Sequence, residues 1–351
     1  MKTKIFSNMK RTGKIAIIAT FCFLYAGVNA QDLHLAQYQT TPMLINPAMT
    51  GRLDNNYRAI LQYRSQWRSF TTRPYTTSIF SFDIPWKDFG FGLVILDNRA
   101  GAGRLNTFNL LLSSAYEITI DPSNRHNLTT GCQLGFIQRS VRVEDLMFDN
   151  QWSPSNGGGF DPSISNGENF DKTSMMMLDI NFGVYYFNVD KFKQFSLKKN
   201  PFGSDMPYYA GIAGYHLQNP KDNFLGENSR YPRKIVGFGG TMMSVADKTY
   251  IEPNALMMLQ AKNLELMAGV NGYYYLKEIN GYFLLGAYYR HKDALSFQTG
   301  IKYEKLVFKV SYDVNAFSLQ SINDRKNGFE ISIMLINDKA DGLSFIPAFR
   351  M

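Results

Sequence analysis

The stretch Leu178-Asp179-Ile180-Asn181-Phe182-Gly183-Val184-Tyr185-Tyr186 decides the fold class of this 351-residue chain. Its large apolar side chains stand at every second position, and Asp, Asn and Gly fill most positions between them. Successive side chains of a β-strand point to opposite faces of the sheet, so alternation with a period of two predicts a strand. The stretch therefore predicts a strand that separates an apolar environment from a polar one.

The same alternation recurs along almost the whole chain. Most of the segments are longer than the roughly 5–6 residues of ordinary soluble strands. They match the roughly 9–11 residues with which a tilted strand crosses a bilayer. We predict fourteen strands, at residues 56–66, 75–84, 89–97, 105–119, 126–139, 175–187, 207–217, 233–243, 249–260, 263–275, 280–291, 294–303, 305–315 and 328–336.

Composition limits the class of protein further. Aromatic residues make up 15% of the chain and charged residues 19%, against an average charged share of about 25%. Such a chain is not disordered, because disorder goes with few aromatic and many charged residues. The mean hydropathy of −0.23 and the lack of an apolar run near 18 residues in the mature chain argue against a bundle of membrane helices.

A soluble sandwich or a propeller would also alternate, but the chain has no repeat of fixed period that would indicate a propeller. An open sheet edge cannot persist in hydrocarbon, so strands of membrane length must close on themselves. We therefore predict an all-β protein, a transmembrane antiparallel β-barrel of about 14 strands in the outer membrane. Tyrosines near strand ends are expected to form an interfacial girdle; they are Tyr57, Tyr116, Tyr186, Tyr250, Tyr282 and Tyr303.

Residues 1–30 have the pattern of a cleavable signal peptide. A basic beginning is followed by the apolar run Ile15 to Gly27 and the cleavage sequence Val28-Asn29-Ala30. Removing its five Lys and Arg lowers their total from 37 to 32 against 29 Asp and Glu, so the formal charge falls from +8 to +3. No basic patch remains that would indicate nucleic-acid binding. Cys132 is then the only cysteine and cannot form an internal disulfide.

The remaining chain divides into three parts. Residues 31–55 are predicted to be a lumenal plug or a periplasmic segment, since Pro42 and Pro47 prevent a long helix there. Residues 56–336 are the barrel and residues 337–351 a tail. If the N-terminus is periplasmic, the short turns lie on the periplasmic side and the long loops lie outside. The lysine-rich stretch 188–206 is the exception, because it is long although it lies on the periplasmic side, and it has no assigned role.

Candidate chemistry is sparse, and we expect no enzyme, no cofactor and no metal. The four histidines have no metal-ligand spacing. A barrel hydrolase would need a Ser or Asp activated by His216 or His291, and no such constellation stands out. Residues 161–171 offer oxygen ligands, but Gly167 and Lys172 depart from the calcium-loop pattern. Two alternatives therefore stay open for this loop: it binds calcium, or it is a solvated turn.

Two motifs around the first strand are the candidate partner-binding or structural site. Arg64 is expected to face the lumen, where a buried charge is normally paired. One prediction is a structural ion pair between Arg64 and an acidic partner such as Glu252 or Asp179. The other is that Arg64 anchors the N-terminal segment or a docked partner. The motif residues are Asn46, Pro47, Gly51, Tyr63, Arg64, Gln66 and Trp67, and the lumen-facing polar residues are Arg58, Gln62, Asp179, Asn181 and Glu252.

These motifs resemble those of the PorP/SprF family of type IX secretion system outer-membrane proteins from Bacteroidota. The features that carry the resemblance are Gln37-Tyr38, Asn46-Pro-Ala-Met-Thr-Gly51, Tyr63-Arg-Ser-Gln-Trp67, Asp97-Asn-Arg-Ala-Gly101, Ala115-Tyr116, Asp179 to Tyr186, Tyr289-Arg-His-Lys-Asp-Ala294 and Tyr312-Asp313. One departure is Asn327-Gly-Phe-Glu-Ile331, where the family usually has a histidine before the glutamate.

The resemblance implies a non-enzymatic component of protein secretion or gliding motility in the outer membrane. Its implied partners are secreted cargo with a C-terminal sorting domain or a surface adhesin, the periplasmic ring and motor proteins, and outer-membrane lipid. The alternative from the residues themselves is a passive or gated channel with an N-terminal plug.

Overall fold

The computed structural model of the chain describes residues 33–53, 56–66, 74–101, 104–122, 126–153, 158–161, 163–167, 173–188, 206–222, 230–279, 281–315 and 328–337. The predicted signal peptide, most of the C-terminal tail and most of the lysine-rich stretch lie outside these residues. No helix among them is long and apolar enough to cross a membrane.

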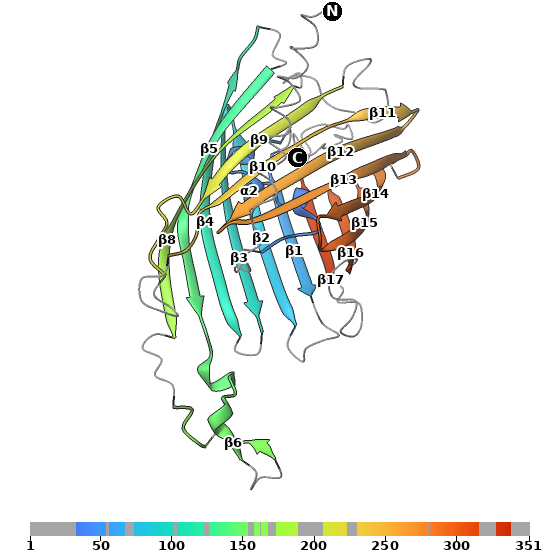
Figure 1. Cartoon of the computed structure of the whole chain (residues 1–351). Coiled ribbons are helices and arrows are strands. Elements are labelled where there is room, and N and C mark those ends of the chain that lie inside the picture. The colour runs from blue at the N-terminus through green and yellow to red at the C-terminus, as the bar shows by residue number, and fades with distance from the viewer. Residues whose placement is uncertain are drawn as a thin grey trace, which may run out of the picture.

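One antiparallel sheet closes on itself to form the barrel (Figure 1). The first strand pairs with the last, from Arg58↔Ile336 to Gln66↔Gly328, and β10 pairs with β12 to complete the ring. β10 and β11 are two parts of one interrupted strand on either side of Met242, which makes fourteen barrel strands. The strands are β1 (Arg58–Gln66), β2 (Tyr75–Trp86), β3 (Phe89–Ala100), β4 (Leu105–Thr119), β5 (His126–Ser140), β8 (Ser174–Asn188), β9 (Tyr208–Tyr215), β10 (Lys234–Thr241), β11 (Met243–Ala246), β12 (Thr249–Gln260), β13 (Asn263–Leu276), β14 (Gly281–Arg290), β15 (Ala294–Tyr303), β16 (Leu306–Asn315) and β17 (Gly328–Ile336).

The predicted fold class is confirmed, because every predicted strand corresponds to one strand of the ring. The structure adds a small hairpin of β6 (Trp152–Ser153) and β7 (Gly159–Phe160), which projects from the barrel on the connection between β5 and β8 (Figure 1). The strand predicted at 233–243 is interrupted at Met242, although the N–H of Met242 donates to the carbonyl of Pro207 in the register of the β10–β9 ladder.

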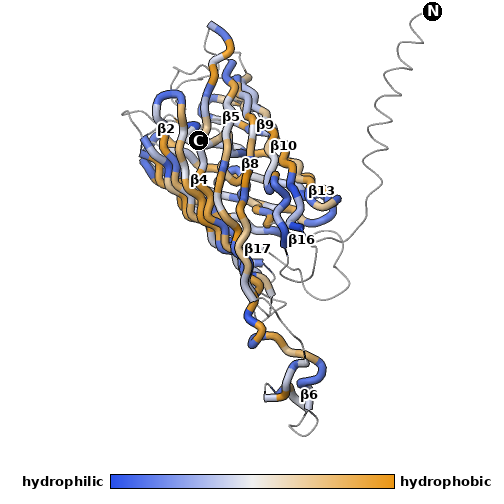
Figure 2. Tube along the Cα trace, turned by 90° about the vertical axis from the view of Figure 1, so that its left-hand side faces the viewer, coloured by the Kyte–Doolittle hydropathy of each residue, from blue (hydrophilic) through white to orange (hydrophobic). Residues whose placement is uncertain are grey.

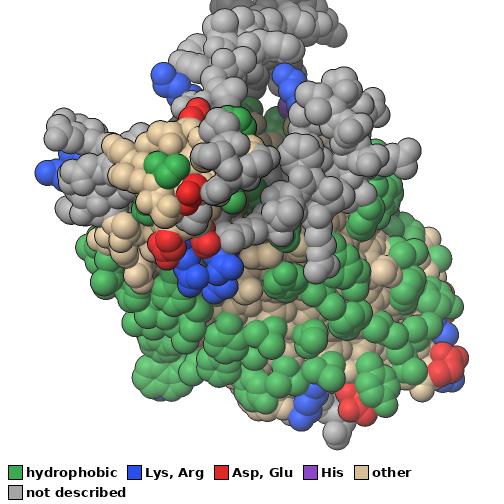
Figure 3. All heavy atoms as spheres, turned by 90° about the horizontal axis from the view of Figure 1, so that it is seen from below, with side chains coloured by type: hydrophobic (Ala, Val, Ile, Leu, Met, Phe, Trp, Pro, Cys, Tyr) green, Lys and Arg blue, Asp and Glu red, His purple; other side chains and the backbone are tan. Residues whose placement is uncertain are grey.

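Hydrophobic and hydrophilic residues follow one another along the strands (Figure 2), and their side chains separate across the barrel wall, as the alternation predicts. On β8, Leu178 is 54% exposed while Asp179 is 1% exposed and Asn181 is fully buried. Hydrophobic side chains gather over a broad part of the outer wall (Figure 3). Apolar groups that are exposed on a closed sheet are suited to lipid, and polar groups that are buried inside it are suited to pairing with one another.

The predicted tyrosine girdle is only partly correct. Tyr116 and Tyr303 are exposed on the outer wall, at 42% and 51%. Tyr250 and Tyr282 are buried inside the lumen, at 1% and 5%. Tyr250 shares its inward face with Glu252, because residues two apart on a strand point the same way.

The two ends of the barrel differ. We call the end at which β1 stops at Gln66 and β5 at Ser140 the loop end, and the end at which β1 starts the turn end. The turn end carries the hairpin turns at Lys87 and Glu304, whose φ angles of 56° and 49° suit tight hairpins. Its lumen is filled by a packed cluster of aromatic and apolar side chains, namely Ala48, Met49, Ile60, Tyr185, Phe187, Tyr209, Met242, Tyr250, Tyr273, Tyr275, Tyr282, Leu284, Val307, Met334 and Ile336.

Candidate functional site

Residues 33–53 lie inside the barrel, and we call them the lumenal segment. They form only short turns of helix, η1 (Tyr38–Thr40), α2 (Pro42–Ile45) and η2 (Pro47–Met49), as expected from the two prolines (Figure 1). Nearly all of their side chains are buried. Such a short irregular segment has little stability of its own, so its conformation must come from the surrounding strands.

Glu330 on β17 anchors the beginning of the lumenal segment. Its carboxylate accepts the backbone N–H groups of Ala36 and Gln37, both at 2.9 Å. The same carboxylate is ion-paired with Arg64 of β1 at 2.8 Å, and it also accepts from Gln62. Charge-assisted bonds of this kind are about twice as strong as neutral ones, so Glu330 joins the first strand, the last strand and the lumenal segment.

Arg64 pairs with Asp313 and Glu330, at 2.6 and 2.8 Å. Arg64 therefore pairs with carboxylates as predicted, but not with the suggested partners Glu252 and Asp179, because β17 pairs with β1 and β16 is the next strand of the sheet. Arg290 also reaches Asp313, at 3.1 Å. All of these groups are buried, so the cluster satisfies its charges internally, as buried charges require.

Glutamine side chains continue the anchoring around the lumen. The Gln37 amide donates to the hydroxyl of Ser311 at 3.2 Å and accepts from Ser332 at 2.6 Å. The Gln39 amide oxygen accepts from Asn271 at 2.6 Å and from Tyr288 at 3.1 Å. These bonds bind the segment to strands β13, β14, β16 and β17, more than 230 positions away in the sequence.

The motif Asn46-Pro-Ala-Met-Thr-Gly51 packs against the opposite wall. The Asn46 side chain accepts from the N–H of Ala48 at 2.8 Å and donates to the carbonyls of Val184 and Ile212, at 2.9 and 3.2 Å. It thus caps η2 and bonds β8 and β9 at once. This double role requires an amide, which offers both an acceptor and donors.

Glycine on the barrel wall makes room for this motif. A Cβ at Gly131 of β5 would lie 2.5 Å from the backbone of Pro47 and Ala48. Gly183 faces the Asn46 side chain, and Gly90 faces Thr50 and Gly51 in the same way. The backbone of the motif therefore touches the wall directly, where any side chain would push it away.

Replacing Gly131 with valine is expected to displace residues 46–51 from the wall, since neither backbone can yield. Overpacking typically costs about 1–3 kcal/mol. The measurement is hydrogen exchange of the peptides covering 42–53, which should exchange faster in the folded barrel. Gly272→Val is the matched control, because a Cβ there meets only ordinary contact at 3.8 Å. Unchanged exchange in Gly131→Val would contradict the close approach.

The end of the lumenal segment is fixed near the turn end. The N–H of Gly51, which has a φ of 66°, donates to Asp83 at 2.8 Å. Arg58 makes two bonds to the same carboxylate, at 2.9 and 2.6 Å. Arg52 is ion-paired with Glu117 of β4. Carboxylates on β2 and β4 therefore fix the conformation of the chain just before β1.

The other residues that were predicted to face the lumen lie in separate hydrogen-bonded groups. Glu252 is fully buried and accepts from Tyr273 at 2.7 Å and from Tyr209 at 3.0 Å. Asp179 contacts His216 at 2.8 Å, and Asn181 accepts the N–H of His216 at 2.8 Å. The predicted lumen-facing set is therefore buried inside the barrel, and Arg58, Gln62, Asp179, Asn181 and Glu252 are all at most 3% exposed.

The residues of the second motif, Tyr63 to Trp67, do not share one environment. Tyr63 is 40% exposed on the outer wall, and Gln66 lines the cavity at the loop end. Trp67 lies outside the described residues. Phe329, which replaces the family's usual histidine, is also on the outer wall, at 42% exposure, so this departure leaves the Glu330 anchor intact.

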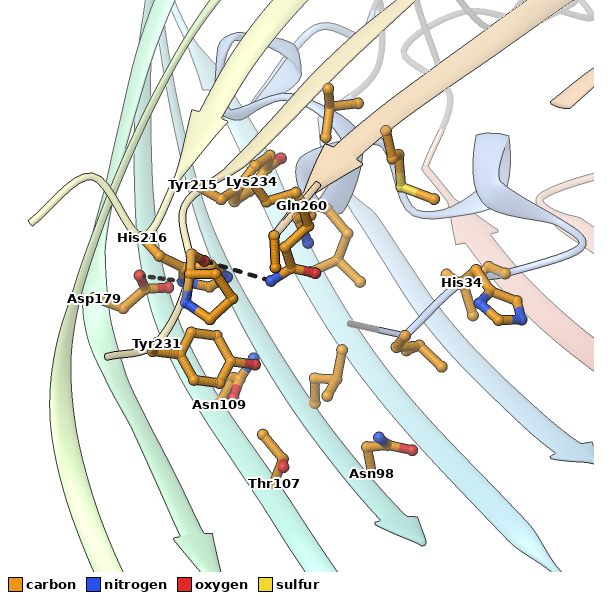
Figure 4. A pocket seen from close by; sticks show the side chains of 18 of the residues that line it. His34, Asn98, Thr107, Asn109, Asp179, Tyr215, His216, Tyr231, Lys234 and Gln260 are labelled. Carbon is orange, nitrogen blue, oxygen red and sulfur yellow. Dashed lines mark hydrogen bonds and ion pairs between the residues drawn. The ribbon is translucent and has the colours of Figure 1, made fainter. Parts of the chain in front are cut away.

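A cavity of about 810 Å³ lies between the lumenal segment and the loop end (Figure 4). Its floor includes Leu33, His34 and Tyr38, and its wall includes Asp179 and His216. Burial, together with the positive charges of Arg290 and Arg64, lowers the pKa of His34 well below its usual value. Its Nδ1 lies 3.7 Å from a carboxylate oxygen of Glu265.

The charged side chains that line the cavity are largely paired with one another. Arg139 is ion-paired with Asp222, and Lys234 stands 4.7 Å above the ring of Tyr215. The described residues hold no group of three or more His, Cys, Asp or Glu that could bind a metal. In the loop proposed for calcium, Asp161 accepts from the N–H and hydroxyl of Ser163, at 2.9 and 2.6 Å, so its carboxylate stabilises a turn.

Several anchoring residues were not predicted as such from the sequence. Glu330, Asp313 and Asp83 stand at inward positions of alternating strands, which was the one available signal. Gln37 and Asp313 belong to motifs that carry the family resemblance, whereas Gln39 has no sequence signal of its own. Their spacing in the sequence does not show that these residues are close in space, because strand register decides which residues are neighbours.

Comparison with protein families matches residues 27–335 to a model described as type IX secretion system membrane protein PorP/SprF. The chain belongs to the PorP/SprF family. The match covers the lumenal segment as well as all fourteen strands, so the anchors described above are part of a PorP/SprF protein. No curated protein matches the sequence.

Among solved structures, the PorP/SprF chain is similar to outer-membrane barrels. The toluene transporter TodX of Pseudomonas putida shares 9% identity, with 85% of this chain and 94% of that chain covered and a TM-score of 0.45. A FadL homologue of Pseudomonas aeruginosa shares 11% identity, with 83% and 92% covered and a TM-score of 0.43. These likenesses concern the barrel alone.

Proposed function

We propose that this PorP/SprF protein is a non-enzymatic docking component of the type IX secretion system. It would bind a secreted protein with a C-terminal sorting domain, or a surface adhesin, and the periplasmic ring. We further propose that the lumenal segment acts as a plug and that the loop end faces outward. Family membership supports a place in the secretion system, and the outer membrane is the place of such a barrel.

The observation that carries the proposal is the anchored lumenal segment. Hydrogen bonds and ion pairs tie it to strands all around the barrel, and the aromatic cluster fills the lumen beyond it at the turn end. A permanently open pore would have no use for such anchoring. A barrel held closed in this way is suited to presenting surfaces at its two ends.

Deleting the gene is expected to leave at least one sorting-domain protein inside the cell. The reason is that a docking component serves its cargo, whereas a general pore would affect small solutes. The measurement is quantitative mass spectrometry of the secreted and cell-retained proteins, with the deletion complemented by the wild-type gene as control. A secreted proteome that does not change on deletion would contradict the proposal.

A gated channel is the second candidate function, and the cavity at the loop end favours it. A volume of about 810 Å³ is within the roughly 300–1,000 Å³ of small-molecule sites. In this reading the lumenal segment would move to open a path. Single-channel recording of the intact chain separates the two candidates, because a gated channel would show conductance steps and a closed docking barrel would show none.

A further inference from the structure

The wall of the barrel has a step between β8 and β9. β8 pairs with β5 along its whole length, from His126↔Asn188 to Ser140↔Ser174. It pairs with β9 only from Phe182 to Phe187. Residues Ser174–Ile180 therefore run past the end of β9 toward the loop end, over a length of about 23 Å at the usual rise per residue.

The chain that leaves β9 covers only the base of this step. His216 has a φ of 56°, which turns the chain away from the strand direction. Leu217 then donates to the carbonyl of Ile180 at 3.0 Å. The Gln218 side chain accepts from the N–H of Ile180 at 3.1 Å and donates to the carbonyl of Leu178. The Gln218 side chain thus makes hydrogen bonds to Ile180 and Leu178 that a neighbouring strand would otherwise make. After this point the chain leads away from β8.

Beyond this point β8 has a free edge. In an antiparallel strand the N–H and C=O of one residue point to the same side, and alternate residues point to opposite sides. Ile180 bonds on the β9 side, so Met176 and Ser174 present their backbone groups on that side too. Within the described parts of the chain, the N–H of Leu178 and both backbone groups of Met176 meet no hydrogen-bond partner.

The free edge lacks the features that normally protect one. Natural edge strands carry a lysine, a proline, a bulge or an inward charge that discourages pairing with another chain. The sequence Ser174-Met-Met-Met-Leu178 contains no lysine, proline or other charged residue, and its register with β5 is unbroken. The edge is held straight by β5 on one side, and no strand among the described residues pairs with it on the other.

We propose that this edge of β8 is a strand-addition site for an extended segment of the secreted partner. The inference rests on the proposed docking function and names the surface that performs it. An added strand would gain backbone hydrogen bonds from the edge, and alternate side chains would provide specificity.

The surroundings of the edge indicate the chemistry of the added segment. Its outward side chains would lie beside Met176 and Leu178, which are 64% and 54% exposed, and so would be apolar. Its inward side chains would face the cavity, where the hydroxyls of Tyr215 and Thr41 and the amide oxygen of Asn109 have no hydrogen-bond partner.

The two carboxylates in this cavity already have a partner each, since Asp222 is ion-paired with Arg139 and Asp179 lies 2.8 Å from His216 Nδ1. A further charge on the inward face would therefore be buried without a counter-charge. The segment is accordingly one in which apolar residues alternate with uncharged polar residues.

Proline at position 176 tests the edge directly. Met176→Pro removes an N–H on the free side and leaves the bonds to β5 in place, since these come from odd-numbered residues. Met176→Ala is the matched control, because it shortens the side chain but keeps the N–H. The tagged chain is purified from solubilised outer membranes of its own host, and sorting-domain proteins are quantified relative to it.

We expect Met176→Pro to lower the co-purified partner about tenfold, with Met176→Ala near the wild type. Heat-modifiable migration confirms that each variant is folded. Equal amounts of partner with Met176→Pro and Met176→Ala would overturn the edge proposal while leaving the docking function in place. No partner with the wild-type chain would overturn both.

Hydrogen exchange gives a second readout that needs no variant. The peptide covering 174–180 should exchange slowly in the complex purified from outer membranes and rapidly in the barrel refolded alone in detergent. Protection in the refolded barrel at low concentration would show that its own chain covers the edge. Protection that appears only at high concentration would show a second copy there. Either result would overturn the proposal.

Discussion

Glu330→Ala is expected to lower the free energy of unfolding by about 3–5 kcal/mol, the cost of breaking one partner out of a buried ion pair. Arg64, at 1% exposure, would lose one of its two carboxylates. The N–H groups of Ala36 and Gln37 would lose their acceptor at the same time. Both losses occur where water cannot replace the missing partner.

Guanidinium titration of the folded barrel in detergent measures this loss. Glu278→Ala, at an exposed turn residue, is the matched control and should change stability by less than about 0.5 kcal/mol. A change of that small size in Glu330→Ala would contradict the anchoring role.

The double variant Arg64→Met/Glu330→Met separates the two losses. Replacing a buried pair by apolar side chains is often neutral, so most of the barrel's stability should return. The backbone of Ala36 and Gln37 would still lack its acceptor. Residues 33–41 should therefore exchange hydrogen faster than in the wild type, even though the barrel is stable.

The barrel could be predicted from the sequence because each strand carries its own signal. Alternation with a period of two is local, and β8 shows it with Leu178 outside and Asp179 inside. The positions of Tyr250 and Tyr282 were misassigned because nearness to a strand end was considered without the parity of the strand. Counting from Glu252 would have placed Tyr250 inside.

The lumenal segment could not be predicted in the same way. It has no periodicity, and its shape depends on partners such as Glu330, whose position beside Arg64 follows from the register of β1 with β17. The acidic partner of Arg64 was missed for this reason. Likewise, the free edge of β8 is visible only once the short pairing with β9 is known.

Deleting residues 33–53 is expected to convert a silent barrel into a conducting one. A closed sheet of fourteen strands falls between small barrels filled by their own side chains and porins with an aqueous channel. Without the segment, Ala48 and Met49 are also lost from the aromatic cluster at the turn end, which loosens the remaining obstruction. A second variant, in which a Gly/Ser linker of equal length replaces 33–53, shows whether occupancy or chain length matters.

Single-channel recording in planar bilayers therefore tests the central claim, that the anchored lumenal segment closes this PorP/SprF barrel. The mature wild-type chain should show no conductance steps. The deletion and the Gly/Ser variant, each shown to be folded by heat-modifiable migration, should both show discrete steps. Steady conductance by the intact wild-type chain, or silence of both folded variants, would contradict the account.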